Sequence, residues 1–121
     1  MLNREQILGA KDRAQQVVEV AEWGGAVTIT ALSVRDRSHV LAQWARMAAE
    51  QKDGDPVRLM ADIKLNLVAL SITDPDGVPL FTLDDVTALA TKSESAIGAV
   101  ADAVIILNRF SVSATEDAAK N

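Results

Sequence analysis

The chain has 121 residues, of which 49% are hydrophobic and 24% charged, and its formal net charge at pH 7 is −5. This profile predicts one soluble globular domain that is large enough to bury a core. The acidic balance and an aromatic content of 3% disfavour a nucleic-acid-binding surface, and the absence of cysteine excludes disulfides and thiolate metal sites.

No apolar run is long enough to cross a bilayer, since even residues 103–107 form a run far below the required length. The first residues also lack the charged and then apolar organisation of a signal peptide. We therefore expect a protein of the cytoplasm with no membrane partner.

The first predicted element is a short helix that Asn3 caps, with Gln6 in the capping-box position three residues later. A β-hairpin over residues 17–32 follows. Gly24 and Gly25 are taken as the two central turn residues, because turns of this kind require positive φ.

This placement of the turn predicts the pairs in the hairpin, with Val20 opposite Ile29 and Val18 opposite Ala31. The same placement sets Trp23 opposite Ala26 and Glu22 opposite Val27. One face of the ribbon is then apolar, while Glu19, Thr28 and Thr30 make the other face polar.

Two long helices are predicted next. Ser33 caps a helix through about residue 50, in which apolar positions at helical spacing form one stripe, namely Val40, Leu41, Trp44, Met47 and Ala48. Asp55 and Pro56 open a second helix to about Leu70. Its apolar positions cover most of the circumference, which predicts the most buried helix of the domain.

The stretch from Asp74 to Gly77 has the residues of a type I turn, with proline second and glycine fourth. Residues 78–81 can add only a short edge strand, because Pro79 lacks an amide proton. Thr82 caps a short helix to about Thr91, and Ser93 or Ser95 begins the last helix, which ends near residues 107–111.

The pattern as a whole predicts an α+β fold. An N-terminal antiparallel β-hairpin packs on a body of four main helices, with a short turn and edge strand near residues 73–81. Residues 1–112 form a single domain, and residues 113–121 are small and polar, so we expect a flexible C-terminal segment.

Catalytic and metal chemistry is disfavoured by the residues themselves. A single histidine, His39, removes most arrangements of nucleophile and base. A calcium loop centred on Gly77 would need carboxylates at positions that Ile72 and Leu83 occupy. We therefore predict no catalytic residue, no metal site and no cofactor, and we expect that the protein is not an enzyme.

Partner binding is the remaining type of site, and the helix at 34–50 offers the candidates Arg35, Trp44 and Met47. Methionine and tryptophan make adaptable contacts, and a groove for a helix could use them. The alternative is that the stripe with Trp44 and Met47 is core that faces the helix at 56–70.

A set of short segments between residue 4 and about residue 111 is informative through its order and spacing. They are Arg4–Leu8, Asp12, Val18–Val20, Glu22–Gly25, Ala69–Leu70, Thr73–Gly77, Leu80–Phe81, Asp85–Val86, Leu89, Lys92–Ser93 and Leu107–Ser111. In this order and spacing they resemble the tail assembly chaperones of long-tailed (siphovirus-type) bacteriophages and prophages. Residues 35–60 depart most from the pattern of the family.

The resemblance implies a protein of the host cytoplasm that binds the tape measure protein, keeps it soluble and helps the major tail (tube) protein polymerise around it. Such chaperones are absent from the mature virion, and in many relatives a ribosomal frameshift makes a longer second form. Whether copies of the chain form a homo-oligomer stays open. The alternatives are a structural tail or tail-completion protein retained in the virion and, less favoured, a small-ligand enzyme.

Overall fold

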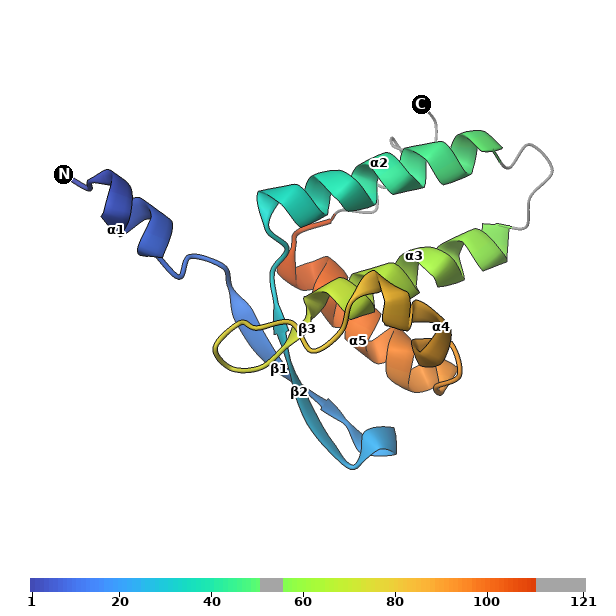
Figure 1. Cartoon of the computed structure of the whole chain (residues 1–121). Coiled ribbons are helices and arrows are strands. Elements are labelled where there is room, and N and C mark those ends of the chain that lie inside the picture. The colour runs from blue at the N-terminus through green and yellow to red at the C-terminus, as the bar shows by residue number, and fades with distance from the viewer. Residues whose placement is uncertain (51–55, 111–121) are drawn as a thin grey trace.

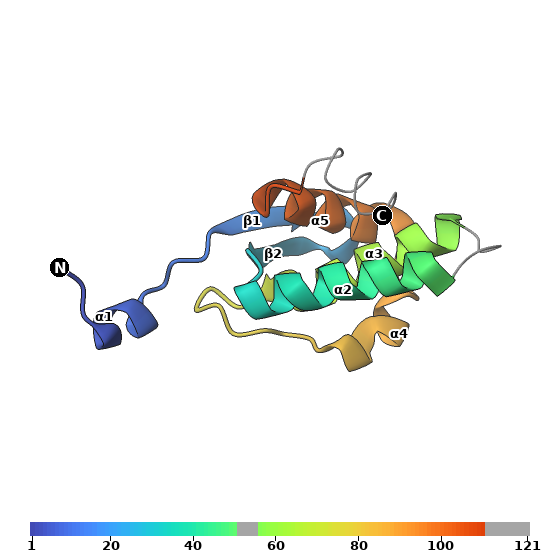
Figure 2. The ribbon, with the colours of Figure 1, turned by 90° about the horizontal axis from the view of Figure 1, so that it is seen from above.

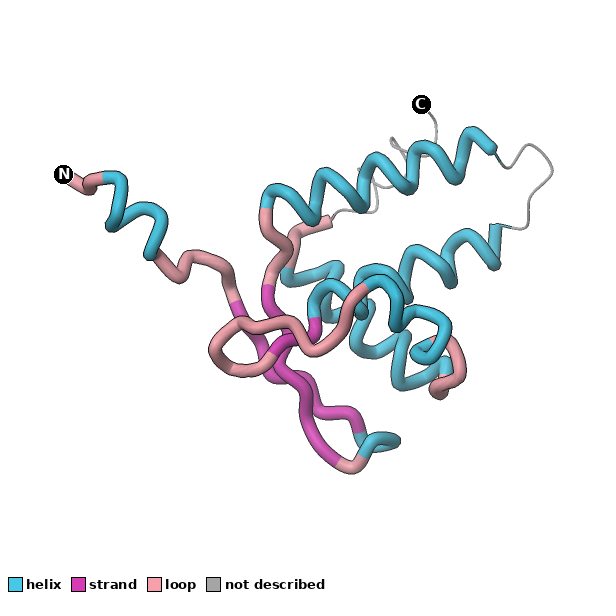
Figure 3. The backbone as a smooth tube through the Cα atoms, viewed as in Figure 1, coloured by secondary structure: helices cyan, strands magenta, loops and turns pink. Residues whose placement is uncertain are grey.

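The computed structural model describes residues 1–50 and 56–110, which form an α+β fold. A three-stranded antiparallel sheet in the order β1-β2-β3 lies against a group of helices, from which α1 stands apart (Figure 1 and Figure 3). In chain order the elements are α1 (Arg4–Gly9), β1 (Gln15–Val20), a 3₁₀ turn (Ala21–Trp23), β2 (Gly25–Thr30), α2 (Val34–Glu50), α3 (Pro56–Ser71), β3 (Ile72–Thr73), a second 3₁₀ turn (Leu83–Asp85), α4 (Val86–Leu89) and α5 (Glu94–Leu107).

The hairpin is present, but its predicted register is wrong. Val18 pairs with Val27 and Val20 with Gly25, so each pairing is displaced by four residues from the expected one. The reason is a longer connection. Ala21–Trp23 form a 3₁₀ turn that Gly24 closes at φ 74°, and this turn packs Trp23 against the core.

Each side chain of the hairpin still lies on its predicted face, because a shift of the strand pairing by an even number of residues does not turn a side chain to the other face. Val20 and Ile29 are buried in the core, as the pattern predicts. The polar face is not fully open to solvent, however. Thr30 is buried and its hydroxyl lies 2.7 Å from the hydroxyl of Thr73 on β3.

The third strand differs from the prediction. Helix α3 continues to Ser71 and runs directly into β3, where Ile72 pairs with Ile29. Residues 78–81, which were expected to form the edge strand, contribute only a bridge between Pro79 and Thr73. The turn that joins the two segments is confirmed, since the amide of Gly77 donates to the carbonyl of Asp74 at 3.0 Å.

Most of the predicted helix starts are confirmed by the hydrogen bonds of their capping residues. Asn3 and Gln6 form a reciprocal capping box, and the hydroxyls of Ser33 and Ser93 each accept from the amide three residues later. The cap expected at Asp55 lies outside the described residues, as does the C-terminal segment 113–121. The helix expected from Thr82 to Thr91 is instead a 3₁₀ turn followed by the short α4.

The core lies between the sheet and three helices. α3 and α5 lie side by side, with α5 also against β1, and α2 packs on the outer side of α3 (Figure 1 and Figure 2). α3 is the most buried helix, as predicted, and Leu67 and Val68 have no exposed surface. Among the described residues, no helix is both long and apolar enough to cross a membrane.

α1 stands apart from this body in Figure 1 and Figure 2. All of its residues are exposed, including the apolar Ile7 and Leu8, and an exposed linker at residues 10–14 joins it to β1. The capping box at Asn3 is therefore its main visible support. The body of the fold does not depend on packing against this helix.

Candidate partner-binding groove

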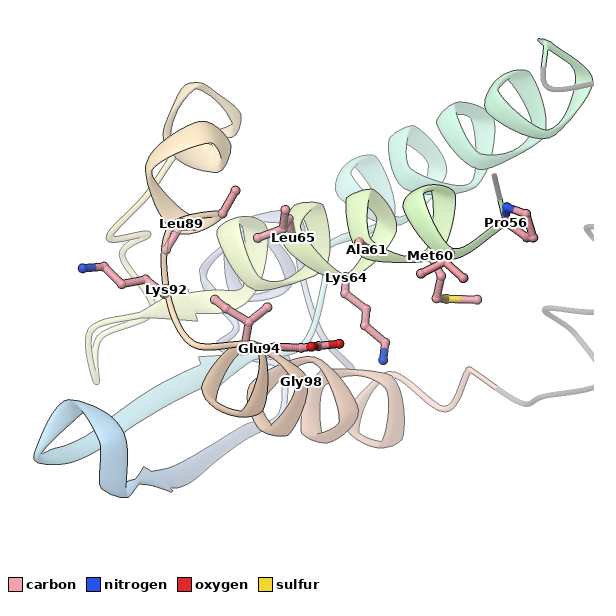
Figure 4. A pocket seen from close by; sticks show the side chains of 12 residues that line it. Pro56, Met60, Ala61, Lys64, Leu65, Leu89, Lys92, Glu94 and Gly98 are labelled. Carbon is pink, nitrogen blue, oxygen red and sulfur yellow. The ribbon is translucent and has the colours of Figure 1, made fainter. Parts of the chain in front are cut away.

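A hollow of about 470 Å³ opens between the first half of α3 and the segment that joins α4 to α5 (Figure 4). α3 lines one side of it with six residues, and the segment from Leu89 to Gly98 lines the other. The lining residues are Pro56, Val57, Met60, Ala61, Lys64, Leu65, Leu89, Ala90, Lys92, Glu94, Ile97 and Gly98.

The sequence of α3 explains why this hollow exists. Apolar residues surround the helix, but only some of them face the sheet, where Ile63 and Leu67 are buried. Val57 and Met60 face the hollow, and 75% and 43% of their surface is exposed. α4 is only four residues long, so it does not cover this half of α3. Apolar side chains exposed around a concavity are typical of an interaction surface.

A second hollow of about 390 Å³ lies on the other side of Leu89 and Lys92, which line both hollows. Its remaining walls are Trp23, Phe81, Asp85 and Ala88, so the hairpin turn and the loop after β3 also contribute. We call the two hollows together the groove, and we call Leu89 and Lys92 the ridge that divides it.

Four ionisable side chains line the groove, and two of them are acids near the start of a helix. The carboxylate of Asp85 accepts from the amide of Thr82 at 2.8 Å within a capping box. Glu94 lies in the first turn of α5, where the helix dipole stabilises a negative charge. These two acids therefore have roles inside the fold.

The two lysines of the groove have no such role. Neither Lys64 nor Lys92 makes an ion pair with a residue in the described part of the chain. Figure 4 shows that Lys64 extends from α3 over the hollow, where Glu94 also extends from α5, and that the ammonium group of Lys92 points away from this hollow at its opposite end. The groove therefore combines an apolar floor with two lysines that make no ion pair within the described residues.

The groove offers mainly apolar contact surface. Within residues 1–50 and 56–110, no three His, Cys, Asp or Glu side chains gather in a way that could hold a metal ion. His39 is exposed on α2 and does not line the groove. What this arrangement can do is bind the apolar face of another molecule.

The three candidates on α2 are not brought into the groove. Arg35 is exposed near the start of the helix, and Met47 is half-buried. Trp44 is only 7% exposed, and its ring centroid lies 5.6 Å from that of Phe110. Their role in partner binding stays a prediction, and Trp44 has a place in the core.

Sequence reasoning missed the groove residues Met60, Leu89 and Lys92. A signal was present in the helix at 56–70, where apolar residues occupy more of the circumference than one buried face needs. That breadth predicts the most buried helix, and it also leaves room for exposed apolar residues. The structure shows that the excess at Val57 and Met60 remains exposed.

Comparison with known proteins gives the fold a class. No protein-family model matches the chain, and no curated protein matches its sequence. A search of solved structures finds the fold in a phage tail assembly chaperone.

That structure is the "Structure of bacteriophage HK97 tail assembly chaperone", with a TM-score of 0.61. The match covers 86% of this chain and 96% of the HK97 chain, at 18% sequence identity. The chain therefore has the fold of a tail assembly chaperone, in agreement with the family that its sequence resembles.

Proposed function

We propose that this protein is a phage tail assembly chaperone that works by binding and without catalysis. The observation that carries the proposal is the fold shared with the HK97 tail assembly chaperone across nearly the whole of both chains. Its partner in this proposal is the tape measure protein, which the chaperone keeps soluble while the tail tube assembles.

The groove supplies a physical means for this role. A long helical partner presents apolar stripes, and an open groove beside α3 can cover such a stripe in the way that helix-in-groove complexes do. Copies that are joined in an oligomer would bind one long partner with greater avidity than a single copy. A chaperone of this kind needs only modest affinity at each site.

The proposal also includes where and when the protein acts. The protein acts in the cytoplasm of the host bacterium, leaves before the virion is complete, and recruits the major tail protein, through a longer frameshifted form where one exists. These statements follow from the family resemblance and extend the shared fold to a function.

Co-expression with the tape measure protein of the same phage tests the proposal. We expect the tape measure protein to become soluble and to co-purify with the chain, and Met60→Asp to reduce both effects. Ile106→Asp, at an exposed apolar position of α5 outside the groove, is the matched control. An insoluble tape measure protein in the presence of the folded chain would contradict the proposal.

The candidates on α2 are tested in the same assay. Arg35→Ala and Met47→Ala should weaken co-purification if α2 also contacts the partner, whereas no change would assign binding to the groove alone. Mass spectrometry of purified virions separates the chaperone from its alternative. Abundant copies in mature particles would show a structural tail or tail-completion protein instead.

A further inference from the structure

We infer that the groove selects an amphipathic helix that carries carboxylates beside its apolar face. This inference rests on the proposed function and narrows it, since it states which segments of a helical partner the chain binds. Its basis is the shape of the apolar floor and the charge of the two lysines.

The shape of the floor favours a partner with two large apolar side chains. The two hollows lie on either side of the ridge residue Leu89, and each is lined mainly by apolar side chains. Met60 lines the first hollow and Trp23 the second. A helix laid across the ridge can therefore place one apolar anchor in each hollow.

The charge of the groove sets the second requirement. Lys92 lies between the hollows and Lys64 on the wall of the first, and neither has an acidic partner among the described residues. The acids of the same lining, Asp85 and Glu94, stabilise the starts of their own helices. Carboxylates on the flanks of a bound helix would complement the two ammonium groups.

The rest of the chain sharpens this selection. With 17 acidic and 12 basic residues, the molecule as a whole is acidic, and so it repels an acidic helix everywhere except beside exposed cations. Local attraction at the groove and repulsion elsewhere act together to fix where such a helix binds. The same charge balance would favour nonspecific contact with a basic helix over the whole surface.

The test uses two synthetic helical peptides that share one leucine face and differ in their flanks, which carry glutamate in one and lysine in the other. Fluorescence anisotropy of the labelled peptides measures their affinity for the full chain. We expect the glutamate peptide to bind more tightly by roughly two- to fivefold for each ion pair, and 1 M salt to reduce this difference.

Lys92→Glu should abolish or invert this preference, while Arg46→Glu, an equal charge change outside the groove, should preserve it. Met60→Asp should weaken both peptides, and circular dichroism of each variant confirms that it is folded. Met60 is partly exposed and Lys92 is exposed, so both substitutions are compatible with the fold.

The inference is overturned if the lysine peptide binds the parent chain as tightly as the glutamate peptide. It is equally overturned if folded Met60→Asp binds both peptides like the parent. If the tape measure protein is solubilised without any charge preference of the groove, this inference fails and the proposed function stands. If the peptides behave as expected but the tape measure protein is not bound, the proposed function fails and the inference stands.

Discussion

The guanidinium group of Arg37 on α2 lies over the ring of Phe110, with its central carbon 4.1 Å from the ring centroid. The same side chain donates a hydrogen bond of 2.8 Å to the carbonyl of Asn108. The buried side chain of Asn108 in turn accepts from the amide of Leu32 at 2.7 Å and donates to the carbonyl of Val104. This cluster fastens the end of α5 to the start of α2.

Removal of the side chain of either Arg37 or Phe110 should destabilise the fold. Phe110→Ala also empties a place against Trp44, so we expect a loss of about 3–5 kcal/mol in the free energy of unfolding. Arg37→Ala should cost about 1–3 kcal/mol through the lost cation–π contact and charged hydrogen bond. Urea denaturation of the two single variants and the double variant measures the coupling between them.

Arg35→Ala is the control, because Arg35 is exposed on the same helix. Its effect should stay within about 0.5 kcal/mol. Strictly additive losses for Arg37→Ala and Phe110→Ala would show that the two side chains do not interact.

The faces of the hairpin are tested by two adjacent substitutions. Val20 is 2% exposed and Glu19 is exposed on the opposite face. Val20→Asp buries a carboxylate and should cost about 3 kcal/mol or more, whereas Glu19→Lys should be nearly neutral. Thermal melting followed by circular dichroism compares the two variants, and equal losses would mean that the assigned faces are wrong.

Substitutions of Gly24 and Gly25 test the conformation of the hairpin turn. Gly24 has φ 74°, and a Cβ atom added there would meet no atom within 4 Å, so only backbone strain opposes a side chain. Gly24→Val should therefore cost about 1–3 kcal/mol. Gly25→Val should be tolerated, because Gly25 begins β2 and the space around it is open.

The melting temperatures of these two valine variants decide the matter. A variant at Gly24 that is as stable as the parent would place the positive-φ residue elsewhere in the connection. A large loss at Gly25 would indicate the shorter, two-residue turn that the structure does not show.

A pH-dependent contact joins the hairpin turn to the start of α5. The pKa of Glu22 is lowered below 4.5, first by a hydrogen bond from its own backbone amide and then by the hydroxyl of Ser95, which donates at 2.8 Å. A carboxyl group whose pKa is lower in the folded state stabilises the fold above its unfolded pKa. That contribution is lost as the pH falls through the folded value.

Ser95→Ala should raise the pKa of Glu22 toward its ordinary value. NMR titration of the side-chain carboxyl carbon of Glu22 measures the change, since the group is fully exposed and the effect on stability is small. An unchanged pKa in the folded variant would remove Ser95 from the cause of the shift.

The stability of the body should not depend on α1. A helix of six residues is too short to be stable alone in water, and none of its side chains is buried. Deletion of residues 1–9 should shift the melting temperature of the remaining chain by no more than about 2 °C. A larger loss would show that Ile7 and Leu8 pack against the body in solution.

The local parts of this fold could be predicted from the sequence because their signals are local. Ser33 and Ser93 cap their helices through contacts three residues away, and the turn at Asp74–Gly77 closes on itself. The strand at Ile72–Thr73 could not be predicted in this way. It continues the apolar run of α3, and only its pairing with a distant strand makes it β structure.

The groove also could not be predicted from local sequence patterns. Its walls come from α3, from the segment between α4 and α5 and from the hairpin turn, which are separated along the chain. An apolar stripe predicts that a helix packs against something, but it does not say what. For this reason the pattern makes Trp44 on α2 a candidate for binding and gives no sign that Met60 on α3 is partly exposed.

The connection over Ala21–Gly24 limits how the length of this hairpin can change in evolution. Loss or gain of two residues there slides β2 along β1 and leaves Val27 and Ile29 turned inward. Loss or gain of a single residue turns every side chain of β2 over and sends its threonines into the core. Length variation at this connection should therefore occur in steps of two, unless a bulge absorbs the odd residue.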